Sequence, residues 1–141
     1  MRIVLDTSVV VAAIRSGTGA SKALLDSFLQ SRAQFLISTP LVLEYEAVLT
    51  RREHLRASGL NAEEVGSLLD MICAAGMQVH MTRNWRPMLR DPDDEMVLGT
   101  AINGRADAIV TLNRGDFAGI PEEFGIEVLS PLEALKKMET E

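Results

Sequence analysis

The chain has 141 residues, 47% apolar and 4% aromatic, with a formal net charge of −6 at pH 7. This length and apolar content exclude a disordered chain, and the single cysteine, Cys73, excludes an intramolecular disulfide and a thiolate zinc cluster. No apolar stretch approaches the ~20 residues of a membrane-spanning helix, and the start of the chain shows no signal-peptide pattern. We therefore expect a cytoplasmic protein with no membrane partner.

Hydrophobic periodicity predicts strands that alternate with helices. In chain order, the first half has expected elements at 3–5 (strand), 7–14 (helix), 21–31 (helix), 35–38 (strand), 41–51 (helix) and 61–75 (helix). Asn61 is the expected N-cap of the last of these helices, since Glu63 and Glu64 follow in its first turn. We expect Cys73, in an apolar run of the same helix, to fill part of the core.

The second half has expected elements at 77–81 (strand), 94–103 (helix), 108–111 (strand), 127–129 (strand) and 131–138 (helix). Gly104 is the expected C-terminal stop of the helix before it. Strands alternating with helices imply right-handed βαβ crossovers and a mainly parallel sheet. No linker divides the chain, so residues 1–141 are expected to form a single α/β domain, whose ligands bind at the carboxyl ends of the strands.

Acidic residues occur at these strand ends. Asp6 directly follows the apolar strand 3–5, where it is either a site residue or simply an N-cap for the next helix. Glu44 shares the spacing of the apolar stripe of helix 41–51, where an acid needs a partner or a cation. Its alternative role is an ion pair with Arg51 or Arg52.

Two further segments bring acids to the same edge. Asp94 is the best placed acid of the run 91–95, because it precedes Val97 and Leu98 by three and four residues; Asp91 and Asp93 are expected to be solvated. Favourable interaction with the helix dipole is a purely structural explanation for the run. Asn113 and Asp116 follow the strand 108–111, where turn chemistry alone would also explain them.

Several carboxylates at one sheet edge are typical of sites for hard divalent cations, which prefer oxygen ligands. His54 and His80 lack metal-ligand spacing and are expected to be surface or structural residues, so the pattern favours Mg²⁺ or Mn²⁺ over zinc. The chain has no Walker loop and no Gly-x-Ser-x-Gly elbow. This combination favours metal-assisted hydrolysis of phosphodiesters.

Three segments, 3–13, 39–45 and 91–101, followed by 106–111, resemble the motifs of the PIN-domain family. The resemblance covers most of the chain and is nearest to the toxin-like branch, the ribonuclease partners of bacterial toxin–antitoxin pairs. It implies a three-layer α/β/α fold with a mainly parallel central sheet. It also implies an endoribonuclease that uses Mg²⁺ or Mn²⁺ to hydrolyse single-stranded or structured RNA.

The resemblance transfers the family's acidic positions to this chain. The catalytic and metal-holding acids fall on Asp6, Glu44 and Asp94. Many relatives carry Thr-Gly-Asp where this chain reads Thr111-Leu112-Asn113, and a Thr-x-Asn-x-x-Asp-Phe form fits residues 111–117, so Asp116 is the expected fourth acid. The supporting residues are expected to be Thr7, Thr111 and Asn113.

Partners follow from the same resemblance. RNA is the expected substrate, and the densest basic group could hold its phosphates or be a solvated surface: Arg51, Arg52 and Arg56. A toxin would be held inactive by an antitoxin, and homodimerisation is expected. The alternatives are a catalytically weak PIN-like module that binds RNA or protein, a DNA-cleaving nuclease of the same chemistry, and a phosphatase, which Asp6-Thr7-Ser8 disfavours because it lacks Asp-x-Asp.

Overall fold

Five parallel strands form the centre of the computed structural model, which describes residues 1–82 and 89–141. The strands are β1 (Arg2–Leu5), β2 (Gln34–Ile37), β3 (Met77–Gln78), β4 (Ala108–Val110) and β5 (Glu127–Leu129). They lie in the order β3-β2-β1-β4-β5, and every neighbouring pair is parallel. The expected α/β fold is confirmed, and the sheet described is parallel throughout.

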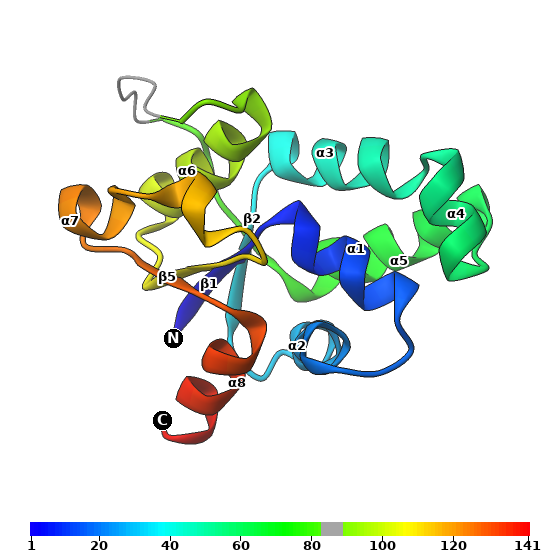
Figure 1. Ribbon diagram of the computed structural model, residues 1–141, viewed down its shortest axis with the longest axis horizontal. Coiled ribbons are helices and arrows are strands. Elements are labelled where there is room, and N and C mark those ends of the chain that lie inside the picture. Colours follow the sequence, from blue (N-terminus) through cyan, green and yellow to red (C-terminus); the bar gives the residue numbers. More distant parts are fainter. Residues whose placement is uncertain (83–88) are drawn as a thin grey trace.

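Helices surround the sheet (Figure 1). Within the described ranges they are α1 (Thr7–Arg15), α2 (Ala20–Leu29), α3 (Thr39–Leu49), α4 (Arg52–Ser58), α5 (Ala62–Ala75), α6 (Pro92–Gly104), α7 (Ile120–Phe124), α8 (Pro131–Glu139) and the 3₁₀ turn η1 (Arg114–Phe117). Helix α6 packs on β1, β2 and β4, while α1 packs on β1 and α2, and α2 packs on α5 and α8. These contacts build the three layers that the resemblance implies.

Burial on both faces explains why the central strands are continuous apolar runs. Ile3, Val4 and Leu5 of β1 are at most 1% exposed, and Ile109 and Val110 of β4 are completely buried. A strand covered by helices on both sides has no solvent face, so it shows no alternation. The chain changes character at the end of each strand, where polar residues follow.

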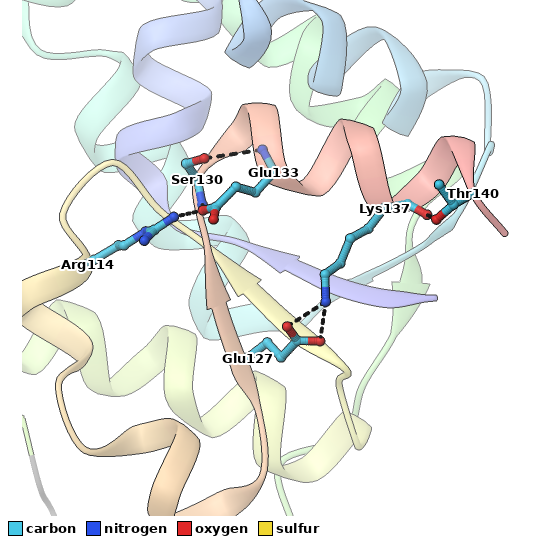
Figure 2. Close-up of polar contacts among 6 residues, drawn as sticks. All are labelled: Arg114, Glu127, Ser130, Glu133, Lys137 and Thr140. Carbon is cyan, nitrogen blue, oxygen red and sulfur yellow. Dashed lines mark hydrogen bonds and ion pairs between the residues drawn. The ribbon is translucent and has the colours of Figure 1, made fainter.

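The C-terminal helix is fixed at both ends (Figure 2). Ser130 and Glu133 form a capping box at the start of α8, and Lys137 reaches the Glu127 carboxylate of β5 at 2.6 Å. Figure 2 also shows Arg114, from η1, forming an ion pair with Glu133. The loop that follows β4 is therefore tied to a capped helix.

The boundaries of several elements differ from the sequence prediction. Helix 41–51 ends at Leu49, and a separate helix, α4, follows with no buried residue, which is why hydrophobic periodicity did not reveal it. The strand expected at 77–81 pairs over two residues only, because β3 is at the edge of the sheet and its neighbour β2 ends at Ile37. The short elements η1 and α7 were not predicted.

Two single-residue predictions were wrong. Gly104 does not stop α6 but is its last residue, and Arg105, in the left-handed region at φ 52°, is the cap. Cys73 is exposed, because α5 turns Val65, Leu69 and Ile72 inward instead. The expected N-cap at Asn61 is confirmed, with a reciprocal capping box to Glu64. No helix in the described part of the chain is long and apolar enough to cross a membrane.

Candidate active site

The strand order places a crevice at the carboxyl ends of β1 and β4. The chain moves from β1 through β2 to β3 on one side, and then returns to β4 and β5 on the other. Right-handed crossovers then send the connections after β1 and β4 to opposite faces of the sheet, and such a reversal opens a crevice. Asp6 follows β1 and Thr111 follows β4, and the two strand ends are joined by Asp6 N–H donating to Val110 O at 2.9 Å.

The Asp6 carboxylate is held rigidly in this crevice. It is only 6% exposed, and its Oδ2 accepts hydrogen bonds from Ser8 Oγ and Thr111 Oγ1, each at 2.7 Å. Asp6 occupies the N-cap position of α1, but its side chain accepts no capping bond, so the simple N-cap interpretation is wrong. Among the described residues no hydrogen bond reaches Oδ1, which leaves this oxygen for a ligand.

Buried hydroxyls position the helices that carry the other acids. Tyr45 of α3 is completely buried and donates a 2.6 Å hydrogen bond to Leu5 O, the carbonyl next to Asp6; burial raises the pKa of its phenol. Ser38, the N-cap of α3, lies 2.7 Å from the hydroxyl of Thr100 on α6, with both side chains fully buried. Sequence patterns did not predict these two hydrogen bonds, because a contact between hydroxyls or carbonyls of different elements carries no periodic signal.

Glu44 and Asp94 face the same crevice from α3 and α6. Both are half-buried. Burial raises the pKa of Glu44, and the charge of Asp93 and its hydrogen bonding raise it further. The pKa of Asp94 is raised from 3.8 to about 7, mainly by burial. The rest of this increase comes from nearby negative charges: Asp6, Asp91, Asp116 and Asp93. The ion pair with Arg51 or Arg52, the alternative role of Glu44, is not formed among the described residues.

A cleft of about 600 Å³ collects these groups. We call its acidic side chains the carboxylate cluster: Asp6, Glu44, Asp91, Asp93, Asp94 and Asp116. The structure therefore brings the four predicted acids to one place. Asp91 and Asp93 are exposed, as expected, but they also line the cleft, a role that the sequence did not assign to them.

The predicted supporting residues also meet here. Thr7 and Asn113 line the cleft, and Thr111 is fully buried beneath it. Thr111 Oγ1 accepts a 3.0 Å hydrogen bond from Asn113 N–H, at the start of the loop that carries Asp116. The ion pair between Arg114 and Glu133 holds this loop from its outer side. Asp116 is therefore presented by a short turn anchored at two points.

Basic residues line the cleft as well, though not all those predicted. Arg51 does so, whereas Arg52 and Arg56 are exposed on α4 and are not among its lining residues. Arg15, at the end of α1, and His54, on α4, line it too, although His54 was expected to be a surface or structural residue. Their approach depends on the packing of α1 against α4, which sequence spacing cannot reveal.

Comparison with protein families identifies the fold. A PIN domain profile matches residues 2–115, most of the chain. The chain belongs to the PIN domain family. PIN domains are generally metal-dependent nucleases, so the family supports a nuclease-type function for the cleft. No curated protein and no solved structure matches the chain significantly.

The donor set of this PIN domain fits a divalent metal by its chemistry. The acidic side chains of the cleft offer carboxylate oxygens, the ligands that Mg²⁺ and Mn²⁺ prefer. The negative charges of its neighbours raise the pKa of Asp94 in addition to the effect of burial. A cation would relieve that repulsion. Within residues 1–82 and 89–141, however, no three His, Cys, Asp or Glu side chains are already positioned to hold an ion. Loading would therefore require these side chains to move together.

Proposed function

We propose that this PIN domain is a metal-dependent endoribonuclease that hydrolyses phosphodiester bonds of single-stranded or structured RNA. The observation that carries the proposal is the convergence of carboxylates on one cleft, where the pKa of Asp94 is raised to about 7. Such a cluster costs stability in the empty protein, and a bound cation would offset this cost. Mg²⁺ is the proposed cofactor, with Mn²⁺ as the other candidate.

In this proposal the acids divide the work. Asp6 and Asp94 would hold the ion, and Glu44 and Asp116 would complete its surroundings directly or through water. When bound, the metal would activate a water molecule and stabilise the charge that develops at phosphorus. Ser8 and Thr111 keep Oδ2 of Asp6 occupied, so the carboxylate is held in one orientation with Oδ1 toward its ligand.

The cellular role is proposed from the resemblance to the toxin-like branch. The protein would be a toxin that acts on cytoplasmic RNA, is inhibited by an antitoxin and pairs with a second copy of itself. Growth arrest on expression, lost in Asp94→Asn, would support this role. Normal growth with active enzyme in the cell would contradict it.

The test of the activity is cleavage of mixed-sequence RNA by purified protein with Mg²⁺, with Mn²⁺ and with EDTA. We expect metal-dependent internal cuts that are lost in Asp6→Asn and Asp94→Asn. Glu46→Gln is the matched control, because Glu46 is exposed on the same helix as Glu44 but does not line the cleft. A parallel single-stranded DNA substrate distinguishes the two nucleic acids.

The second candidate is a catalytically weak PIN module that binds RNA or protein. The observation in its favour is that no three described residues are positioned to hold a metal. If folded wild-type protein binds RNA but leaves it intact with every metal, this candidate replaces the nuclease.

A further inference from the structure

Helices α1 and α3 both run from the acidic part of the cleft towards a basic part. Asp6 precedes α1 and Arg15 ends it, while Glu44 lies within α3 and Arg51 follows it. The two helices pack on each other, and both contact α4, at their far ends (Figure 1). At 1.5 Å per residue, the nine steps from Asp6 to Arg15 separate their backbones by about 13 Å.

The three basic side chains of the cleft gather around α4, and we call them the basic cluster: Arg15, Arg51 and His54. Nη1 of Arg15 lies 3.4 Å from Nδ1 of His54. A guanidinium can only donate, so Nδ1 is the acceptor of this contact, and Nε2 has no hydrogen-bond partner among the described residues and is available to a ligand. Arginine and histidine donors at one place suit a phosphate.

The two arginines of this cluster form no ion pair with a carboxylate in the described part of the chain. The charge of Arg51 does act on Glu44, whose pKa it lowers. Unpaired arginines beside a carboxylate cluster in one cleft are poorly explained by stability, since closer pairing with those acids would stabilise both. They are well placed for an anion that arrives from outside.

Apolar residues line the same cleft at positions between the two clusters. Val11 and Ala12 lie in α1 between Asp6 and Arg15, and Val48 lies in α3 between Glu44 and Arg51. We call these three residues the apolar floor. A sugar or base can pack against such a surface, whereas a phosphate cannot. The cleft therefore presents the carboxylate cluster, the apolar floor and the basic cluster in that order. A nucleotide chain presents a phosphate, a nucleoside and the next phosphate in the same order.

We propose that Arg15, Arg51 and His54 form a subsite for a backbone phosphate next to the scissile one, with the intervening nucleoside over the apolar floor. This inference rests on the proposed nuclease function, and it names a substrate contact that is independent of the metal. Because of the helical separation and the contact with His54, Arg15 serves a different phosphate from the one at Asp6. The substrate must then extend beyond the cleaved bond.

The first test measures binding of a fluorescently labelled RNA oligonucleotide in EDTA, where a metal-dependent enzyme does not cut. We expect Arg15→Ala and His54→Gln each to raise Kd about tenfold. The slope of log affinity against log salt is negative, and for single strands each lost phosphate contact makes it less steep by about 0.7, so Arg15→Ala should show this change as well. A purely structural role for Arg15 would not alter the salt slope of the folded protein.

Two matched variants remove the same charge elsewhere. Arg32→Ala removes an exposed arginine that does not line the cleft, and Arg56→Ala removes one on the same helix as His54. We expect both to change Kd less than twofold. If either weakens binding as much as Arg15→Ala, or if Arg15→Ala binds like wild type, the subsite is wrong. Arg15→Lys, which keeps a charge at the end of α1, guards against a folding artefact and should lose less affinity.

The second test varies substrate length with metal present. A dinucleoside monophosphate has only the scissile phosphate, so Arg15→Ala should reduce its kcat/KM far less than that of a longer oligonucleotide, for which KM should rise about tenfold. Equal losses on both substrates would overturn the proposal. If wild type cuts neither substrate while the differences in binding persist, the subsite remains and the nuclease proposal fails instead.

Discussion

The hydroxyl of Thr111 donates a 2.7 Å hydrogen bond to Oδ2 of Asp6 across 105 positions of sequence. Thr111 Oγ1 also accepts a hydrogen bond from the Asn113 N–H at 3.0 Å, so one buried hydroxyl fixes both the central carboxylate and the beginning of the loop to Asp116. The ends of β1 and β4 are thereby joined through side chains as well as through the sheet.

Replacing Thr111 with Val should therefore impair both the site and the fold. The change keeps the shape but leaves the Asn113 N–H without its acceptor, which should lower the free energy of unfolding by about 1–2 kcal/mol. We expect the rate of RNA cleavage to fall at least tenfold, because Asp6 loses one of its two fixed hydroxyl partners. Thr111→Ser retains the hydroxyl and should recover most of both, as measured by urea denaturation and initial rates. Equal behaviour of Val and Ser would mean that the bond has no role.

The pKa of Asp94 makes the stability of the metal-free protein depend on pH. Because the folded-state pKa, about 7, exceeds the ordinary 3.8, the folded protein holds a proton that the unfolded chain has released. In EDTA this contribution is present at low pH and is lost as the pH rises from about 4 to about 7. The melting temperature should fall over this range, and it should fall less in Asp94→Asn.

Adding Mg²⁺ near pH 8 should reverse that loss in wild type, since a cation neutralises the ionised cluster. The same addition near pH 5, where Asp94 carries its proton, should raise the melting temperature much less. Differential scanning fluorimetry of both proteins across pH gives the comparison. A pH profile identical in wild type and Asp94→Asn would show that Asp94 does not retain its proton in the fold.

Substitutions can decide whether Asp116 or Asn113 fills the fourth position of the site, since both residues line the cleft. We expect Asp116→Asn to raise the Mg²⁺ concentration for half-maximal cleavage about tenfold or more, because it removes a charged ligand. Asn113→Ala should have a smaller effect. If Asn113→Ala has the larger effect, the roles are reversed.

The ion pair between Arg114 and Glu133 should contribute little to stability. Arg114→Ala, which removes it, should cost less than about 1 kcal/mol of stability, since both partners are exposed.

Two helical glycines form a matched pair for stability. A Cβ at Gly104 would lie 2.7 Å from Leu36 Cδ1 and 2.8 Å from Val79 Cγ2, whereas a Cβ at Gly66 in α5 would meet nothing within 4 Å. Gly104→Ala should therefore destabilise the fold by about 1–3 kcal/mol through overpacking. Gly66→Ala should stabilise it by up to about 1 kcal/mol through helix propensity. Denaturant midpoints measure both, and stabilisation by Gly104→Ala would contradict the close packing.

Much of the fold was accessible from sequence because its signals are local. Apolar runs or alternation indicated each strand of the described residues, and Asn61 with its two glutamates indicated the start of α5. The signal failed where elements lack a buried stripe, as in α4, or are only one turn long, as in η1 and α7. It also failed for Cys73, because an apolar run does not reveal which of its residues the helix turns outward.

Sequence alone determined that acids follow buried strands, and the resemblance assigned Asp6, Glu44, Asp94 and Asp116 to one site. Only the tertiary structure decided what surrounds them. The hydrogen bond between Ser38 and Thr100 and the contact between Arg15 and His54 join residues of different elements. A local sequence pattern therefore cannot predict either contact. Periodicity fixes which face of an element is buried, but the packing of elements fixes which charges meet and therefore how each group ionises.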